Sequence, residues 1–385
     1  MARLDEIFDL QMGKTPSRNN ADYWTDGQYD WVSIADLGSY QKYVGDTKER
    51  ISALAVQESG IKSVPANTVI MSFKLSLGKT AITQEPVYTN EAIMAFIPTG
   101  KYAVLPDYFY YLFSAKDWIK GTNRAVMDTT LNKATLGAVS ITVPPIDEQH
   151  KIAAVLDKVS DLIVKRQQQL DKLDEAVKAR FVEIFGEPDE NPKHWQEDEL
   201  SHHLKVIGGY AFKSDGFTDE GIPVLRIGNI NSGHFLPVNM VYWPDDLALA
   251  RYKVFPGDLV MSLTGTVGKD DYGNVCILGA DYDEYYLNQR NAKLSIEKSL
   301  NKCYFSELLK FPRIKKRLTG ISRGIRQANI SNKDILTLRV PMPPIELQEQ
   351  FAAFVEQTEK TKIIISHSLE KLETLKKALM QEYFG

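Results

Sequence analysis

The sequence predicts an α+β fold in which two similar mixed α/β domains are each followed by a long helix, and the two helices pair. Three observations support this. The second half of the chain repeats the first, each half ends in about 40 residues with helical spacing, and the remainder consists of short apolar runs. We therefore expect a domain at 1–146, a helix at 147–186, a linker at 187–198, a domain at 199–345 and a helix at 346–385.

The internal repeat is clearest near the end of each half. Residues 144–149 read PPIDEQ and residues 343–348 read PPIELQ, and the same alignment continues without a gap to Gly186 and Gly385. Further upstream the match is looser but stays in order. Solenoid repeats have a period of ~20–50 residues, so this much longer period indicates duplication of a whole domain together with its helix.

Both segments that close the halves are predicted to be coiled-coil helices. In the first, residues recur at alternating spacings of four and three from Ile152 to Val177, with Arg166 as a polar member. The second has Thr358 and Lys362 at equivalent positions. Two copies of either helix would pair badly, whereas the two different helices can pair, with polar seam residues that specify the register. The residues expected to pair the helices are Ile152, Leu156, Val159, Ile163, Leu170, Leu173, Val177, Phe351, Val355, Ile365, Leu369 and Leu372.

An alternative for the helices is that each packs only on its own domain. Helices of this length could not bury a two-sided seam on a small domain, which favours pairing. The domains themselves are predicted to contain short strands within residues 29–34, 68–72, 222–227 and 258–262, which are apolar or alternating runs bounded by Gly, Pro, Asn or Asp.

The composition is that of an ordinary globular chain. Its 385 residues are 43% hydrophobic and 25% charged, which excludes a mostly disordered protein. The two cysteines, Cys276 and Cys303, have no ligand cluster around them, so we expect free thiols and no metal site. The acidic N-terminal segment does not match a signal peptide, and no apolar stretch approaches the ~18 residues of a membrane span. We expect a cytoplasmic protein without membrane contact.

No catalytic motif is recognisable in the sequence. Residues 76–80 (SLGKT) resemble the end of a phosphate-binding loop, but position 73 is Phe where that loop requires Gly. There is no dinucleotide fingerprint, and the Pro-Pro pairs lack the polar and aromatic neighbours found in base-flipping amino-methyltransferases. The histidines are scattered, and no Ser–His–acid arrangement is apparent. We therefore expect a chain without a catalytic site.

A local excess of basic residues points to a binding surface for nucleic acid. Residues 311–327 contain six Lys or Arg and no acid, although the whole chain has a net charge of −4. Such a segment attracts phosphates without reading sequence, whereas bases are read by side chains such as Arg, Asn and Gln. The candidate DNA-binding residues lie in polar loops of both halves and are Lys14, Arg18, Asn19, Asn20, Arg124, Asn132, Arg226, Asn229, Asn231, Arg323, Arg326, Gln327 and Asn329.

Over its whole length the chain resembles the specificity subunit of Type I restriction–modification systems. The resemblance is carried by the Pro-Pro-Ile-x-x-Gln segments at 143–149 and 341–348, with support from 31–37 and 224–230. The second helix departs from the first at Leu347, where the first has Glu148. Two glycine–lysine pairs also fit, and they add Lys79 and Lys269 to the DNA-binding candidates.

This resemblance implies that each domain is a target-recognition domain that reads one half of a bipartite target in double-stranded DNA. The two helices would run antiparallel and act as a ruler that sets the unread spacer. They would also dock two modification subunits, and restriction subunits with translocase activity would join the complex. The chain itself would be a non-catalytic subunit of a complex with site-specific DNA endonuclease and adenine-N6 methyltransferase activities.

The resemblance implies no cofactor on this chain; S-adenosylmethionine, ATP and Mg are implied for the partner subunits. Two alternatives remain open. The first is a self-contained DNA methyltransferase or nuclease fragment, which would need a cofactor loop and a base-flipping motif. The second is a coiled-coil assembly protein whose domains bind other proteins and not DNA.

Overall fold

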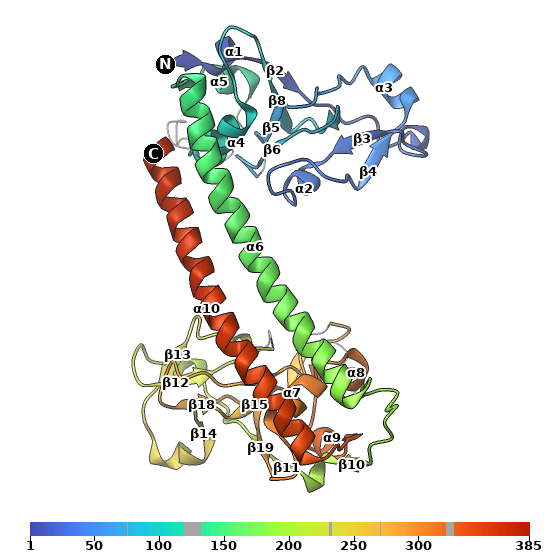
Figure 1. Cartoon of the computed structure of the whole chain (residues 1–385), viewed down its shortest axis with the longest axis vertical. Coiled ribbons are helices and arrows are strands. Elements are labelled where there is room, and N and C mark those ends of the chain that lie inside the picture. Colours follow the sequence, from blue (N-terminus) through green and yellow to red (C-terminus); the bar gives the residue numbers. More distant parts are fainter. Residues whose placement is uncertain (75, 119–131, 231–232, 270, 321–326) are drawn as a thin grey trace. The chain divides into compact units, whose positions relative to one another are not determined.

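The computed structural model of the chain separates into two compact units, each with one mixed α/β domain and parts of two long helices. The first unit comprises Met1–Gln167 with His367–Gly385, and the second comprises Gln168–Ser366. The long helices are α6 (Ile146–Phe185) and α10 (Ile345–Phe384) (Figure 1). The predicted fold class is confirmed. The structure describes residues 1–74, 76–118, 132–230, 233–269, 271–320 and 327–385.

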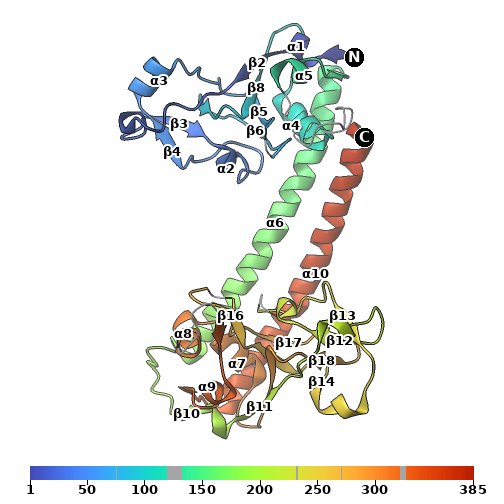
Figure 2. The same cartoon turned by 180° about the vertical axis from the view of Figure 1, so that it is seen from behind.

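The first domain is built on a four-stranded antiparallel sheet in the order β2-β8-β5-β6. The central strands β5 and β8 are apolar because their two faces contribute to two different apolar clusters. A second sheet, in the order β4-β3-β7, lies with α2 and α3 on the side of the domain away from α6 (Figures 1 and 2). The strands are β1 (Ala2–Arg3), β2 (Phe8–Met12), β3 (Tyr29–Val32), β4 (Glu49–Ile51), β5 (Val69–Ser72), β6 (Thr80–Ile82), β7 (Tyr88–Thr89), β8 (Ile93–Pro98) and β9 (Ser140–Ile141).

Short helices of the first domain gather around the start of α6. In both views α1, α4 and α5 lie near this end of the long helix, and β1 pairs with β9 close to it (Figures 1 and 2). The helices are α1 (Leu4–Ile7), α2 (Ile34–Leu37), α3 (Ala53–Ser59), α4 (Pro106–Ala115) and α5 (Lys133–Gly137).

The second domain has the same arrangement of sheets. Its main sheet has the order β11-β19-β15-β17 and its second sheet the order β13-β12-β18-β14, while β10 pairs with β21 and β16 with β20. The strands are β10 (Glu197–Glu199), β11 (Leu204–Gly208), β12 (Ile222–Leu225), β13 (Val241–Trp243), β14 (Lys253–Val254), β15 (Leu259–Ser262), β16 (Thr264–Thr266), β17 (Val275–Ile277), β18 (Tyr285–Leu287), β19 (Asn291–Ile296), β20 (Gln327–Asn329) and β21 (Arg339–Pro341). The helices are α7 (Lys302–Leu308), α8 (Pro312–Thr319) and α9 (Asn332–Leu336).

The main sheets of the two domains correspond strand by strand, and the second sheets share three strands, to which the second domain adds β14. The order β2-β8-β5-β6 matches β11-β19-β15-β17, and in each second sheet a central strand (β3 or β12) has one parallel and one antiparallel neighbour. The four strands expected from the sequence are present as β3, β5, β12 and β15. The loose sequence match upstream of the helices therefore reflects duplication of a complete domain.

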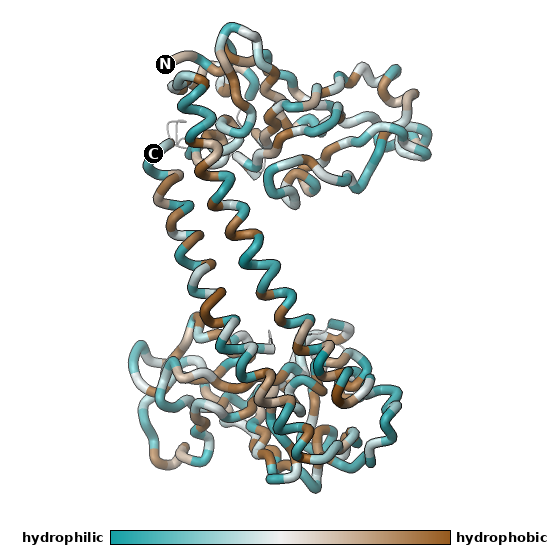
Figure 3. Tube along the Cα trace, in the orientation of Figure 1, coloured by the Kyte–Doolittle hydropathy of each residue, from teal (hydrophilic) through white to brown (hydrophobic). Residues whose placement is uncertain are grey.

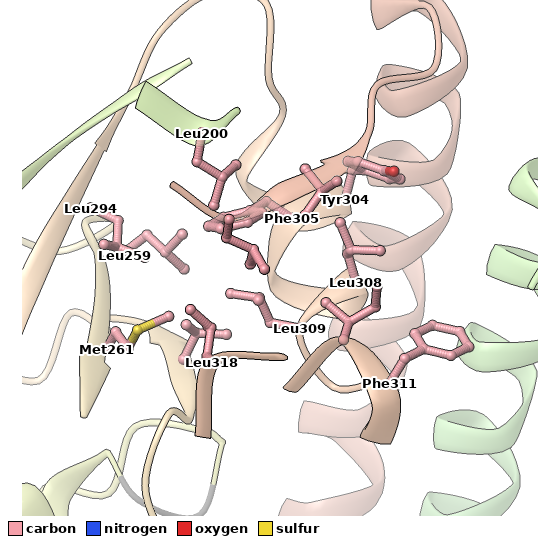
Figure 4. Close-up of a cluster of buried hydrophobic side chains, with 14 of the residues drawn as sticks. Leu200, Leu259, Met261, Leu294, Tyr304, Phe305, Leu308, Leu309, Phe311 and Leu318 are labelled. Atoms are coloured by element: carbon pink, nitrogen blue, oxygen red, sulfur yellow. The ribbon is translucent and has the colours of Figure 1, made fainter. Parts of the chain in front are cut away.

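The core of the second domain lies between its main sheet and the long helices. Figure 4 shows side chains of α7 and the following turn meeting those of β15 and β19. Phe181 of α6 stacks on Tyr304 of α7 with ring centres 5.4 Å apart, and it meets Phe351 of α10 edge to face at the same distance. Both long helices therefore contribute aromatic side chains to this one core.

Within the second unit the two long helices run antiparallel. Phe185 at the end of α6 contacts Phe351 near the start of α10, whereas Asp174, a few turns earlier in α6, pairs with Lys362, later in α10. Figure 3 shows apolar and polar residues alternating along both helices, as expected for one apolar stripe on each.

Within the first unit the end of α10 packs into the core of the first domain. Leu379, Met380 and Tyr383 border the cluster that contains Ile152 and Leu156 of α6. Phe384 meets Tyr108 of α4 with ring centres 5.5 Å apart. The predicted pairing of α10 with α6 is therefore confirmed, and α10 packs in addition on the domain that it does not follow in sequence.

The residues predicted to pair the helices differ in burial. Those near the domains are buried, namely Ile152, Leu156, Val159, Val177, Phe351 and Val355. Those in the middle of the helices are half-buried, namely Ile163, Leu170, Leu173, Ile365, Leu369 and Leu372. Their individual contributions to pairing stay predictions. No helix in the described parts of the chain combines the length and apolar character needed to cross a membrane.

Candidate nucleic-acid interface

One loop in each domain begins at a close backbone crossing, and in the first domain this loop carries Lys14, Arg18, Asn19 and Asn20. Gly13 and Gly209 follow the first strands of the two main sheets. A Cβ on either would lie 2.2 Å from a backbone carbonyl oxygen of an adjacent segment of the same chain, that of Thr89 or Asn288 respectively. At the next residue, the amide of Lys14 donates to Thr89 and the amide of Tyr210 to Leu287, both at 2.8 Å. Only glycine allows this approach, so both loops leave their sheets along the same path.

In the first domain this loop is held by side chains predicted to bind DNA. The guanidinium of Arg18 pairs with both carboxylate oxygens of Glu49, one at 2.9 Å, and lies 3.7 Å from the ring centre of Trp24. These hydrogen bonds lower the pKa of Glu49 and raise that of Arg18. Asn20 caps the following turn by accepting from the amide of Asp22 at 3.1 Å. Arg18 and Asn20 therefore have internal partners that stiffen the loop.

The turns that follow β3 and β12 are capped by equivalent buried side chains. Asp36 accepts from the amide of Ser33 at 3.1 Å, and Asn229 accepts from the amide of Arg226 at 2.9 Å. Asn229 also donates to the carbonyl of Leu236 at 3.0 Å. Asp36 is 1% and Asn229 is 2% exposed. Asn229, which the sequence offered as a base reader, thus holds its own loop in this structure, as Asp36 does in the first domain.

The other candidates in the described residues lie at turns or strand ends. Asn132 caps α5 by accepting from the amide of Thr135 at 2.9 Å. Lys14 donates to the carbonyl of Ser59. Asn19, Lys79, Lys269 and Asn329 are exposed, and Gln327 is the first residue of β20. Arg124, Asn231, Arg323 and Arg326 lie outside the described residues.

A basic surface is present on α8, within the segment whose charge the sequence singled out. Ile314 and Leu318 face the core, so Arg313, Lys316 and Arg317 point outward; these three residues form the α8 basic cluster. They line a hollow of about 360 Å³ together with Asp189 from the segment after α6. Arg317 Nη2 lies 3.9 Å from Asp189 Oδ1, so one carboxylate faces three cations.

The structure brings together a Ser–His–acid arrangement that was not apparent in the sequence. His203 Nδ1 lies 2.7 Å from Ser299 Oγ, and its Nε2 lies 3.1 Å from Asp198 Oδ2. Asp198 also contacts His202 at 3.0 Å. Asp198 and His203 are five residues apart, but Ser299 lies 96 residues from His203, so no local spacing pattern could reveal the arrangement. It ties β10 to the turn before α7.

The hydrogen bond from His202 and the backbone amide of Glu199 lower the pKa of Asp198 from 3.8 to about 2. The carboxylate is therefore ionised at neutral pH and accepts hydrogen bonds from both histidines. Within the described part of the chain, no three His, Cys, Asp or Glu side chains are grouped as metal ligands would be.

Two similar domains, polar loops at equivalent strand ends and paired helices together form the layout of a known family. A sequence model described as "Type I restriction modification DNA specificity domain" matches residues 1–174 and 192–374, one match for each half of the repeat. The chain belongs to this family.

Individual relatives agree with the family assignment. The chain is 28% identical over 273 residues to the Type I restriction enzyme MjaIX specificity subunit of Methanocaldococcus jannaschii, covering 66% of this chain but only 62% of that relative. It is 25% identical to the MjaVIII specificity subunit of the same organism, covering 99% of this chain and 90% of that relative. A crystal structure of the S subunit of a Type I restriction–modification system from M. genitalium aligns with a TM-score of 0.58 at 15% identity, covering 100% of this chain and 95% of that one.

The chain is thus a DNA specificity subunit of a Type I restriction–modification system, a non-catalytic component of such enzymes. This assignment agrees with a structural and not a catalytic role for the hydrogen-bonded residues Ser299, His203 and Asp198.

One pair of residues in this specificity subunit was not among the candidates predicted from the sequence. Gln149 and Gln348, the glutamines of the repeated Pro-Pro-Ile-x-x-Gln segments, are fully buried, and the repeat itself was the signal that could have identified them.

Proposed function

We propose that this specificity subunit binds double-stranded DNA with a bipartite target, and that each domain reads one half. The observation that carries the proposal is the matching strand order of the main sheets in the two domains, because two equivalent readers imply two read segments. The equivalent caps Asp36 and Asn229, and the equivalent crossings at Gly13 and Gly209, place loops at the same strand ends of each reader.

The paired helices would keep the two readers apart and so set the length of the unread spacer. Each long helix has 40 residues, which corresponds to about 60 Å for an unbroken helix. The antiparallel contacts within the second unit, Phe351 with Phe185 and Lys362 with Asp174, support a stiff two-helix rod. A stiff rod is what a fixed half-site spacing requires.

The α8 basic cluster supplies a contact for the DNA backbone in this proposal. Its three cations are exposed and face one partly compensating carboxylate, so a phosphate would find a net positive surface. Such contacts strengthen binding without selecting sequence. Base reading is assigned to the exposed candidates Asn19, Lys79, Lys269 and Asn329, and to Arg124, Arg323 and Arg326, which lie outside the described residues.

The partners would be two modification subunits docked on the helices, and restriction subunits that join them. S-adenosylmethionine would then be bound by the modification subunits, and ATP with Mg by the restriction subunits. The relatives are named as specificity subunits of Type I restriction enzymes, which supports a role within a larger enzyme.

The test is selection of bound duplexes from a randomised pool, with the purified chain and its modification subunits present. We expect the selected duplexes to share two short specified segments separated by a spacer of fixed length. The chain alone, incubated with labelled S-adenosylmethionine, should transfer no methyl group. Recovery of duplexes without any common sequence would contradict the proposal and favour an assembly protein.

A further inference from the structure

Gln149, near the start of α6, makes three internal hydrogen bonds. Its Oε1 accepts from the amide of Leu105 at 2.9 Å. Its Nε2 donates to the carbonyls of Ala103 and Pro144, both at 2.9 Å. Leu105 is the residue that precedes the first turn of α4, and Pro144 is the first proline of the Pro-Pro pair. One side chain therefore connects the turn before α4, the Pro-Pro segment and the long helix.

Gln348, near the start of α10, makes the same three contacts in the second domain. Its Oε1 accepts from the amide of Asn301 at 2.8 Å. Its Nε2 donates to the carbonyl of Pro343 at 2.8 Å and to that of Ser299 at 3.4 Å. Asn301 is the N-cap of α7, just as Leu105 is the N-cap of α4. The two glutamines thus have equivalent partners, position by position.

Both glutamines are completely buried, with an exposed fraction of 0%. In each, the acceptor oxygen and both donor hydrogens of the amide are used, so the side chain is fully satisfied only in this arrangement. Loss of the amide would leave one backbone amide and two carbonyls without these partners in a site closed to water. The arrangement is therefore a specific clamp, which helix propensity alone would not require, because an exposed glutamine would serve the helix equally well.

The clamps act on the helices that carry each domain's core. Phe109 and Phe113 of α4 belong to the buried cluster of the first domain, and Tyr304 and Phe305 of α7 to that of the second. Packed cores are not continuously deformable. A change in the angle between α4 and α6, or between α7 and α10, would therefore rotate the whole core of that domain relative to the long helix. The clamps are thus placed to set the orientation of each domain on the long helix that follows it.

We propose that Gln149 and Gln348 are positioning residues for DNA recognition: each fixes the orientation of one reading domain on its helix, and together they determine which half-site spacing is accepted. This inference rests on the proposed bipartite function. It assigns to the glutamines no contact with DNA. The half-sites that are read should therefore not depend on them, whereas the tolerance for spacer length should.

The test uses the variants Gln149→Met and Gln348→Met in the full chain with its modification subunits. Methionine has similar length but offers no amide. The matched controls are Gln168→Met in α6 and Gln357→Met in α10, because both of these glutamines are exposed on the same helices. Affinity is measured for duplexes with the selected spacer and with spacers one base pair longer or shorter.

We expect the wild type and both controls to bind duplexes with the selected spacer more tightly than those with longer or shorter spacers. In each clamp variant this ratio of affinities should fall about tenfold, while the selected half-sites stay the same. If the two glutamines only stabilised the fold, the clamp variants would contain a smaller fraction of protein able to bind DNA, but their preference for spacer length would be that of the wild type. An unchanged preference in folded clamp variants would overturn the inference and leave the bipartite function intact. A wild type that shows no preference for spacer length would instead overturn the proposed function.

Hydrogen exchange provides a second measurement. The amides of Leu105 and Asn301 should exchange at least tenfold faster in the respective clamp variant than in its control. Equal exchange rates would overturn the clamp. If the methionine variants do not fold, Gln149→Glu and Gln348→Glu take their place. A protonated carboxyl keeps the acceptor and one donor, so lowering the pH should increase the protection of these amides relative to a Gln168→Glu or Gln357→Glu control at the same pH, and no relative increase would count against the clamp.

Discussion

Lys362 of α10 and Asp174 of α6 form an ion pair of 2.6 Å at the position where the sequence placed a polar residue in an apolar seam. Glu359, one turn earlier in α10, also lies 2.6 Å from the Lys362 ammonium. Burial disfavours the charged ammonium, but the hydrogen bonds that the ammonium donates to both carboxylates outweigh this effect and raise the pKa of Lys362. The polar seam residue is therefore compatible with pairing because an acidic residue of the other helix meets it.

This ion pair should contribute little to stability. The side chain of Asp174 is 69% exposed, so solvent screens the attraction. A double-mutant cycle with Lys362→Met and Asp174→Ala should give a coupling free energy below about 1 kcal/mol in urea unfolding. Lys360→Met is the control, since Lys360 pairs only with Glu356 of its own helix among the ion pairs in the described residues. A coupling of several kcal/mol would contradict this assessment.

The aromatic contact between the helices should matter far more. Phe351 is completely buried and meets both Phe181 and Phe185. Replacing it with Ala removes these contacts and leaves a cavity, so Phe351→Ala should lower the unfolding free energy of the second unit by about 3–5 kcal/mol. The control Ile364→Ala, at a residue that is 72% exposed, should change it by less than about 0.5 kcal/mol. Similar losses in both variants would mean that the helices do not share this core.

The length of the helices should determine the spacer. Inserting seven residues near Leu170 in α6 and near Leu369 in α10 preserves the heptad pattern and lengthens each helix by about 10 Å. This corresponds to about three base pairs at ~3.4 Å each. Selection from randomised duplexes should recover both half-sites unchanged with a spacer longer by that amount. Altered half-sites, or an unchanged spacer, would show that the helices do not act as a ruler.

The α8 basic cluster should contribute salt-dependent affinity. If Arg313 and Arg317 each neutralise one phosphate, the double variant Arg313→Ala/Arg317→Ala should reduce the slope of log K against log salt by about 1.8. The preferred sequence should not change, because backbone contacts carry no base information. Lys205→Ala is the control, since Lys205 is exposed and paired with Glu297. An unchanged slope would place the cluster away from DNA, and the same measurement on Arg323→Ala/Arg326→Ala tests the neighbouring segment.

The tie between Asp198 and the two histidines should make stability depend on pH. The folded-state pKa of Asp198 is lowered to about 2 from 3.8, so its contribution is present above pH 3.8 and is lost as the pH falls toward 2. The melting temperature of wild type should exceed that of Asp198→Asn at pH 5, and the difference should shrink between pH 4 and pH 2. Asp219→Asn, at an exposed carboxylate, is the control. A constant difference over this range would mean that Asp198 is not the titrating group.

Sequence reasoning was strongest where the signal was periodic or repeated. The long helices, the strands β3, β5, β12 and β15 and the duplicated domain follow from spacing and repetition, which are properties of neighbouring residues. It was less informative about the interface, because Arg18 and Asn229 have polar groups typical of DNA readers and also have partners in their own domains, Glu49 for the exposed Arg18 and Leu236 for the buried Asn229. A list of polar loop residues cannot separate those that face solvent from those that cap turns.

The sequence by itself determined the class of the protein: two copies of one domain, two helices able to pair, and a resemblance that the family match bears out. Only the tertiary structure decided that α10 ends in the core of the first domain, that Ser299 meets His203, and that Gln149 and Gln348 are clamps. The physical reason is that hydrogen bonds and core contacts join residues far apart in the chain, and their partners exist only once the fold has brought them together.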